Sequence, residues 1–191
     1  MNNIKNLFEY EKQIRKEADF ILYEGGLKKI IAQYGRVEMA GSYPLRMMYK
    51  KDLDITLVSS QLQPQKFFEL GGKIAEHLGS HFLYYHNTRI KSLPLRPTNA
   101  LYFGVSFKDW KIDLWVTSEE WWKESEIYMN NILNKLTDER RMIILELKKE
   151  FSNTSDYGRK FSSKQIYSSV LDHGVKSIDE FKEFIMLSKS L

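Results

Sequence analysis

Two aspartates inside a predicted β-strand place the strongest constraint on what this chain can fold into. From Leu53 to Val58 apolar and polar residues alternate, and Asp52 and Asp54 both belong to the polar half of the pattern, which is typical of a half-buried strand. Because side chains repeat every two residues along a strand, both aspartates point to one face, with Cα atoms roughly 6–7 Å apart. Like charges on one face of a strand repel each other unless a positive group lies between them. A hard divalent cation such as Mg²⁺, which also binds phosphates, satisfies this requirement.

A Gly-Ser pair upstream of this strand predicts a phosphate-binding loop. Gly41 allows the backbone to approach a phosphate closely and to adopt φ values that other residues avoid. Ser42 offers a hydroxyl and an N–H group to a phosphate oxygen. A helix that began at Pro44 would add further N–H donors for an anion. Arg46 and Lys51 follow in the same basic loop, where they are candidates for contacts with a nucleotide.

The order of these residues resembles the signature of the DNA-polymerase-beta-like nucleotidyltransferases. That signature is an apolar residue, Gly, Gly or Ser, a spacer, and then Asp, an apolar residue, Asp or Glu, and an apolar residue. In this chain nine residues separate Gly41-Ser42 from Asp52-Leu-Asp-Ile55. The family usually carries a third carboxylate on a later strand, and Asp113 takes that place here. The resemblance covers roughly residues 30–117.

The resemblance implies an enzyme that transfers an NMP from an NTP such as ATP to a hydroxyl group and releases pyrophosphate. Two Mg²⁺ ions, with Mn²⁺ as the alternative, would bridge the attacking and the leaving oxygen. Asp52 and Asp54 would hold both ions, while Asp113 would hold the ion nearer the acceptor and take the proton of the acceptor hydroxyl. The nucleotide-binding set that follows is Gly41 and Ser42 for the β- and γ-phosphates, with Arg46 and Lys51.

The sequence constrains the acceptor less than the donor. No basic tract interleaved with aromatic residues points to RNA, so a small molecule, as in antibiotic-modifying relatives, is the expected acceptor. A protein or a tRNA end, as in relatives from toxin–antitoxin pairs, is the alternative. Two further hypotheses are a nucleotide- or partner-binding module without turnover and a structural α/β domain whose aspartates lie on the surface. The preferred base and the oligomeric state stay open.

Composition and charge exclude several other classes of protein. The 191 residues are 42% hydrophobic and include no cysteine, which predicts a folded, cytoplasmic chain without disulfides. No apolar run approaches the ~20 residues that span a bilayer, so no membrane partner is expected. The net charge of +4 is too small to indicate duplex nucleic acid. Basic residues concentrate in 28–51 and 85–107, which flank the site strands, as a triphosphate pocket requires.

The succession of predicted elements indicates an α/β (α+β) fold with a mixed β-sheet flanked by helices. Residues 4–32 predict helix that is interrupted at Gly25-Gly26. Pro64 at a first turn and Gly79 just past an end bound a further helix. The two strands nearest Asp113 read as a hairpin, which makes the sheet mixed. The remaining expected strands cover 37–40, 81–90, 101–107 and 110–117.

Beyond Thr117 the pattern is helical only, which predicts a catalytic domain over 1–117 and a C-terminal helical domain over 118–191. We expect the helical domain to pack against the sheet and the cleft between them to receive the acceptor. The expected helices cover 118–136, 138–152, 163–173 and 178–188.

Details of the helical region can be checked directly against the structure. Thr117 is the expected N-cap of its first helix, and Trp121 and Tyr128 lie on the expected buried stripe of that helix. Lys160 and Lys164 either reach the phosphates from this region or lie solvated at the start of a helix.

Overall fold

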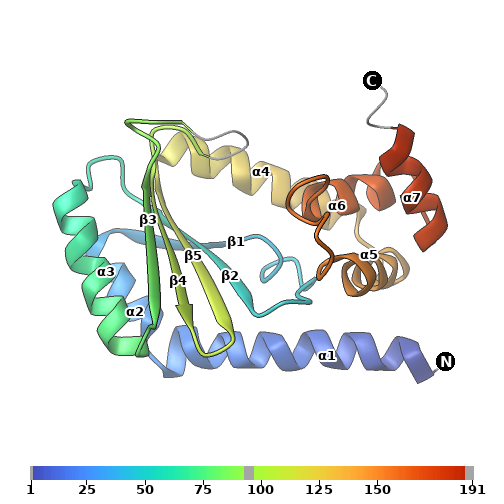
Figure 1. Cartoon of the computed structure of the whole chain (residues 1–191), viewed down its shortest axis with the longest axis horizontal. Coiled ribbons are helices and arrows are strands. Elements are labelled where there is room, and N and C mark those ends of the chain that lie inside the picture. The colour runs from blue at the N-terminus through green and yellow to red at the C-terminus, as the bar shows by residue number, and fades with distance from the viewer. Residues whose placement is uncertain (1, 93–96, 188–191) are drawn as a thin grey trace.

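The computed structural model of the chain describes residues 2–92 and 97–187, and it contains one β-sheet surrounded by helices (Figure 1). The helical segments are α1 (Asn2–Asp19), the π-helix η1 (Phe20–Glu24), α2 (Leu27–Ile31), the 3₁₀-helix η2 (Ala32–Tyr34), α3 (Pro64–Leu78), α4 (Glu119–Lys135), α5 (Asp138–Phe151), α6 (Ser163–Leu171) and α7 (Ile178–Leu187). The strands are β1 (Arg36–Ala40), β2 (Asp52–Val58), β3 (Phe82–Asn87), β4 (Leu101–Phe107) and β5 (Trp110–Thr117).

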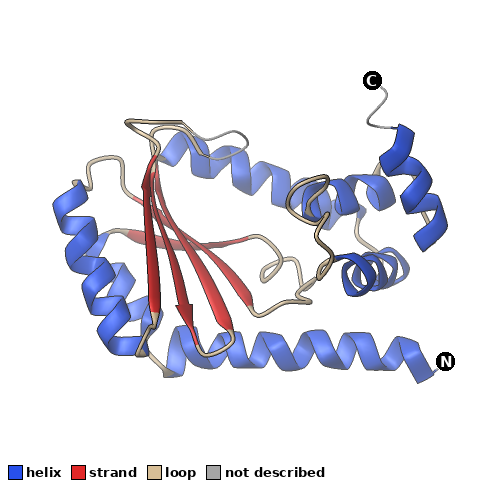
Figure 2. Ribbon diagram, viewed as in Figure 1, coloured by secondary structure: helices blue, strands red, loops and turns tan. Residues whose placement is uncertain are grey.

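The five strands form a single mixed sheet in the order β1-β2-β5-β4-β3 (Figure 2). Strands β2 and β5 run parallel, and every other neighbouring pair is antiparallel. Strands β4 and β5 form the predicted hairpin, whose tight turn holds Lys108 at a φ of 50°. The predicted α+β fold with a mixed sheet and flanking helices is therefore confirmed.

The alternating pattern of β2 separates a core face of the sheet from a polar face. Leu53 and Ile55 are fully buried on the core face, where they pack in one cluster with Phe67 and Leu70 of α3. Helix α3 ends as expected at Gly79, which adopts the left-handed conformation with a φ of 62°. Burial of this apolar half leaves the polar half of β2 on the opposite face of the sheet.

The loop between β1 and β2 is fixed by side chains that enter two different cores. Leu45 and Met47 pack into the cluster formed by the C-terminal helices, whereas Met48 packs into the cluster under the sheet. All three side chains are buried. The loop is therefore anchored at its centre, and the phosphate-loop candidates before it and the strand after it are held in place.

The C-terminal helices build the second cluster, and α1 lies along them as well as along the sheet (Figure 1). Thr137 caps α5 by accepting from the N–H of Arg140, and Ser162 forms a capping box at the start of α6 with Gln165. The division into domains over 1–117 and 118–191 stays a prediction. None of the helices within the described ranges is both long and apolar enough to cross a membrane.

Some local predictions about α4 and the phosphate loop are wrong. Ser118, not Thr117, caps α4, because Thr117 is still paired with Val58 in the sheet. The buried face of α4 accordingly carries Trp122 instead of Trp121, and Tyr128 is 40% exposed.

No helix begins at Pro44, because residues 41–46 form consecutive turns. Arg46 adopts a φ of 54°, which a right-handed helix does not allow, and the N–H of Met47 donates back to the carbonyl of Ser42.

Candidate active site

The register of the sheet brings the three predicted carboxylates together. Asp54 on β2 lies directly opposite Asp113 on the parallel strand β5, and adjacent strands are about 4.8 Å apart. Asp52 is on the same face of β2 as Asp54 and lies opposite Lys111. Residues 59 positions apart in the chain thus meet on one face of the sheet, which the sequence pattern could not establish.

Burial of these carboxylates concentrates negative charge. Burial, and then the charges of Asp52 and Asp113, raise the pKa of Asp54 from its ordinary value of 3.8 to about 7. Burial also raises the pKa of Asp52, and its Oδ1 atom has no hydrogen-bond partner among the described residues. A half-buried, repelling carboxylate pair with an unsatisfied oxygen fits the requirements of a hard divalent cation.

Asp113 is engaged by its neighbours on the sheet. Tyr102 of β4 donates its hydroxyl to Oδ1, and Lys111 donates its ammonium to Oδ2 at 2.7 Å. Burial opposes the charged form of Lys111, but Asp52 and Asp113 outweigh it and raise the pKa of the ammonium. Within the described ranges no three acidic or histidine side chains are already arranged around one point as metal ligands. Lys111 is therefore the lysine that pairs directly with Asp113, and its charge also acts on Asp52 and Asp54.

The phosphate-loop candidates begin in contact with the carboxylates. Gly41 has a φ of 67°, and a Cβ atom there would lie 2.0 Å from Oδ2 of Asp54. Glycine is required at this position both by the left-handed backbone and by the lack of space. Ser42 follows half-buried in the turns, while the side chain of Arg46 is exposed.

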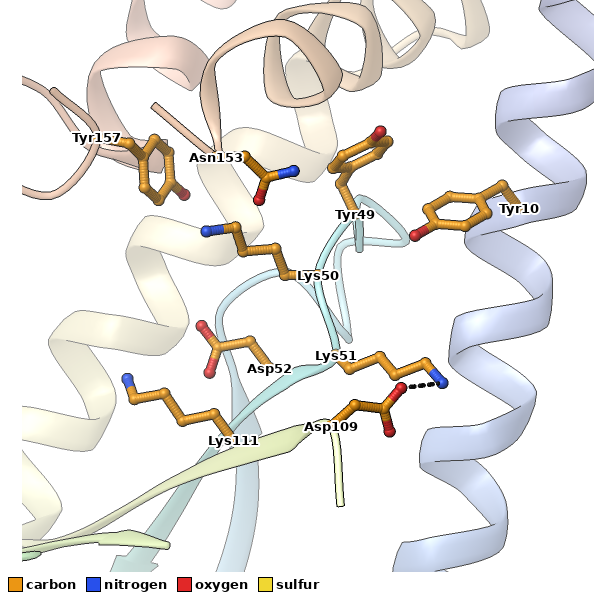
Figure 3. A pocket seen from close by; sticks show the side chains of 9 residues that line it. All are labelled: Tyr10, Tyr49, Lys50, Lys51, Asp52, Asp109, Lys111, Asn153 and Tyr157. Atoms are coloured by element: carbon orange, nitrogen blue, oxygen red, sulfur yellow. Dashed lines mark ion pairs between the residues drawn. The ribbon is translucent and has the colours of Figure 1, made fainter. Parts of the chain in front are cut away.

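Lys50 and Lys51 point in opposite directions, as their adjacent positions before β2 dictate (Figure 3). Lys51 forms ion pairs at 2.8 Å with Asp109 and with Glu17 of α1, and these hydrogen bonds raise the pKa of its ammonium. Lys50 instead lies over the ring of Tyr157, 5.2 Å from its centre. In this structure Lys50, which the sequence did not single out, lies on the Asp52 side of the chain.

Lys148, a buried lysine of the helical region, is likewise not among the site residues predicted from the sequence. Lys148 of α5 is only 4% exposed, and its ammonium donates to the carbonyl of Met47 at 2.6 Å and to the hydroxyl of Tyr167 at 3.3 Å. Burial lowers its pKa, which the nearby charges of Asp54 and Asp52 partly offset. Lys148 lies four residues after Ile144 and three after Leu145, which are both buried, and this helical spacing was the signal that could have revealed it.

Lys160 and Lys164, which the sequence offers as phosphate contacts, each interact with another side chain of the protein. Lys160 forms an ion pair with Asp156 at 2.8 Å. Lys164 lies over the ring of Tyr128, 5.5 Å from its centre. Whether they reach a bound nucleotide stays a prediction.

A cleft of about 610 Å³ opens between the sheet, α1 and the segment after α5 (Figure 3). Its size is typical of a small-molecule site. The lining is unusually rich in tyrosine and lysine, which offer aromatic faces and positive charge around Asp52. The lining residues are Tyr10, Tyr49, Lys50, Lys51, Asp52, Asp109, Lys111, Asn153 and Tyr157.

Comparison by sequence gives no match, whereas comparison by structure does. No protein-family model matches the chain, and no curated protein matches it. A crystal structure of the Cid1 poly(U) polymerase with Mg and 3′-dATP bound is similar to 92% of this chain, with a TM-score of 0.62 and 14% identity. A second structure, of Cid1 as an RNA terminal uridylyl transferase, covers 91% with a TM-score of 0.56 and 13% identity.

A cytoplasmic RNA terminal U-transferase is similar to 90% of the chain, with a TM-score of 0.55 and 15% identity. All three structures belong to the DNA-polymerase-beta-like nucleotidyltransferase superfamily. The chain spans only 57% of the Cid1 chains and 53% of the U-transferase chain. At these identities the likeness establishes the fold, and the nucleotidyltransferase fold expected from the sequence is confirmed.

Proposed function

We propose that this protein is a nucleotidyltransferase that transfers an NMP from an NTP to the terminal hydroxyl of an RNA. The observation that carries the proposal is the convergence of Asp52, Asp54 and Asp113 on one face of the sheet, with Asp54 in contact with the loop at Gly41. Like charges that are buried, as at Asp113, or half-buried, as at Asp52 and Asp54, are costly to keep in a folded protein. Their presence beside a phosphate loop is explained by a reaction between phosphates and a cation.

Some residues of the site would bind the NTP donor with its cation, and others would bind the acceptor. Asp52 and Asp54 would hold the divalent cation, for which Mg²⁺ is the first choice and Mn²⁺ the alternative. The cation would stabilise negative charge on the transferred phosphoryl group. Gly41 and Ser42 would contact the triphosphate. Lys148 of α5 is close enough for the charges of Asp54 and Asp52 to act on its ammonium, which donates to the Met47 carbonyl.

Asp113 lies on the far side of Asp54 from Gly41, where the acceptor would enter. The acceptor oxygen forms a bond to the α-phosphorus as the bond from that phosphorus to the bridging oxygen of the β-phosphate breaks. Pyrophosphate leaves with the electron pair, and Asp113 accepts the proton of the hydroxyl. The catalytic unit over 1–117 would supply these groups, and the helices over 118–191 would form the opposite wall.

An RNA end replaces the small-molecule acceptor expected from the sequence. The three structures with the same fold are named as a poly(U) polymerase or as RNA terminal uridylyl or U-transferases, which favours the RNA alternative. The cleft lining favours it as well, because tyrosine faces and lysine charges suit bases and phosphates together. The sequence contains no tract in which basic and aromatic residues are interleaved, but the fold gathers tyrosines and lysines from separate segments around the cleft.

Donor binding and RNA extension can be tested separately. With Mg²⁺ and a hundredfold excess over Kd, the correct NTP should stabilise the protein by ~2.7 kcal/mol and raise Tm by a few degrees. Labelled single-stranded RNA should be extended with that NTP. Loss of several kcal/mol of transition-state stabilisation in Asp52→Asn should slow extension ~1000-fold.

Asp179→Asn is the matched control, because this exposed aspartate pairs only with Lys182 on α7 among the described residues. It should extend RNA like the wild type. The proposed function would be overturned if Asp52→Asn extended RNA at the normal rate. It would also be overturned if none of the NTPs raised Tm in the presence of Mg²⁺.

A further inference from the structure

One row of residues crosses all five strands and connects the phosphate loop to the opposite edge of the sheet. Ala40 pairs with Asp54, Asp54 with Asp113, Asp113 with Gly104, and Gly104 with Tyr84. Residues directly opposite one another on adjacent strands point to the same face. Tyr84 therefore shares its face with the carboxylates and lies two strands, or about 10 Å, from Asp113.

The glycine in this row makes room for a second tyrosine. A Cβ atom on Gly104 would lie 2.5 Å from the hydroxyl oxygen of Tyr102, so the side chain of Tyr102 passes over Gly104 toward Asp113. The ring of Tyr102 packs on Trp115 at a centroid distance of 4.5 Å and meets Tyr84 edge-on at 6.2 Å. An aromatic floor thus runs from the edge strand to the carboxylate.

The outer part of this floor is open to solvent. Tyr84 is 50% exposed and Phe82, two residues earlier on the same face of β3, is 57% exposed. Adjoining large aromatic side chains that stay exposed on one face of a sheet can mark an interaction site. Neither β3 nor β4 contains an acidic residue, and the side chain of Lys111 on the same face is 53% exposed. The surface is compatible with a polyanion that carries aromatic bases.

The position of the floor relative to the loop assigns it to the acceptor. Gly41 touches Asp54 from the β1 side, whereas the floor reaches Asp113 from the β4 side. An in-line transfer requires the leaving pyrophosphate and the incoming hydroxyl on opposite sides of the α-phosphorus. The triphosphate and the acceptor must therefore approach the carboxylates from different sides.

Resting on the proposed function, we propose that Tyr84, with Phe82 and Tyr102, forms a stacking platform for the last bases of a single-stranded RNA acceptor. The platform presents the terminal 3′-hydroxyl to Asp113. Stacking on aromatic faces tolerates any base, so the platform selects an unpaired end, not a sequence. Tyr84 is a positioning residue here, since it lies two strands from the reacting atoms.

The test compares Tyr84→Ala with Tyr84→Phe in the full chain. Anisotropy of a fluorescein-labelled single-stranded RNA measures Kd without NTP, and extension of the same RNA separates KM for RNA from kcat. We expect Tyr84→Ala to raise Kd and KM about 10-fold, the scale of a lost base stack. Tyr84→Phe, which keeps the ring, should behave like the wild type. Phe20→Ala removes an aromatic side chain of similar exposure, 58%, and should change nothing, because it lies on η1, whose Ile21 and Leu22 belong to the core cluster with Leu53 and Ile55.

The outcomes separate this inference from the function on which it rests. The NTP-dependent rise in Tm should be the same in Tyr84→Ala as in the wild type. Unchanged Kd and KM in Tyr84→Ala, with RNA still extended, would overturn the platform and leave the proposed function standing. The platform would also be overturned if single-stranded RNA does not bind, or if Tyr84→Ala alters only the oligomeric state seen by gel filtration.

Discussion

Gly41 and Asp54 touch: a Cβ atom on the glycine would lie 2.0 Å from Oδ2 of the aspartate, well inside any normal contact. The loop that would hold the triphosphate and the carboxylate that would hold the cation are therefore one packed unit. Anchoring of the loop by Leu45 and Met48 keeps this contact in place. The position of the Asp54 carboxylate depends on a residue that has no side chain.

Gly41→Ala should displace the carboxylate of Asp54 and reduce activity about 100-fold, the usual cost of a misplacement of about 1 Å. The backbone strain of an alanine at a φ of 67° adds ~1 kcal/mol of destabilisation. Gly26→Ala is the matched control, because its φ of 80° imposes similar strain in open space. Rates and Tm are measured for both. Equal activity in the two variants would contradict a specific role of the Gly41–Asp54 contact.

Lys148→Met tests the buried ammonium of α5. Removal of the charge should raise KM for the NTP ~10-fold or more, the scale of a charge-assisted hydrogen bond. Tm should fall modestly, because the Met47 carbonyl loses its donor, although methionine fills the space and no buried charge has to be desolvated. The neighbouring Lys149→Met, on the exposed side of the helix, should leave KM unchanged. An unchanged KM with a large fall in Tm would instead make Lys148 an anchor of the Met47 carbonyl.

Tyr102→Phe removes the hydroxyl that bonds Asp113 and keeps the ring in its stack. Because the hydroxyl orients a carboxylate on the acceptor side, kcat should fall ~10-fold with KM for the NTP unchanged. Tyr85→Phe, on the opposite face of β3, serves as the control because its ring contacts Phe67 and Phe103 without approaching Asp113. A normal kcat would show that the bond does not position Asp113 for the reaction.

Metal-free protein should lose stability as the pH rises, because of Asp54. Burial, with the nearby carboxylates, raises its pKa from 3.8 to about 7 in the folded state, so the folded state retains a proton that the unfolded chain releases. This contribution is fully present below about pH 4, declines by at most ~1.4 kcal/mol per pH unit, and is lost above about pH 7.

The variant Asp54→Asn has no proton to release, so its advantage in stability over the wild type should grow from about pH 4 to pH 7 and then level off. Thermal melts of both proteins in a chelator, across this range, measure the difference. Addition of Mg²⁺ should reduce the difference at neutral pH, because the cation stabilises the ionised carboxylates. If the difference in stability between the two proteins were the same at every pH, ionisation of Asp54 would not be coupled to folding.

Much of the fold follows from local sequence signals. The alternation in β2 placed Asp52 and Asp54 on one face, and Pro64 and Gly79 bounded α3, because strand period and helix ends depend on nearby residues. Local signals could not determine the residue at which α4 begins. Thr117 and Ser118 can both cap a helix, and only the pairing of Thr117 with Val58 in the sheet decides between them.

The sequence by itself determined the chemistry available to this protein: two carboxylates on one strand face, a glycine-serine turn before them and a third aspartate on a later strand. Only the tertiary structure decided their arrangement, because the order of strands and their register depend on contacts between distant segments. That arrangement placed Asp113 opposite Asp54, Lys148 behind the loop at Met47, and Tyr84 in line with the carboxylates. It also turned Lys51 toward Glu17 and Asp109, since adjacent residues of an extended chain point to opposite sides.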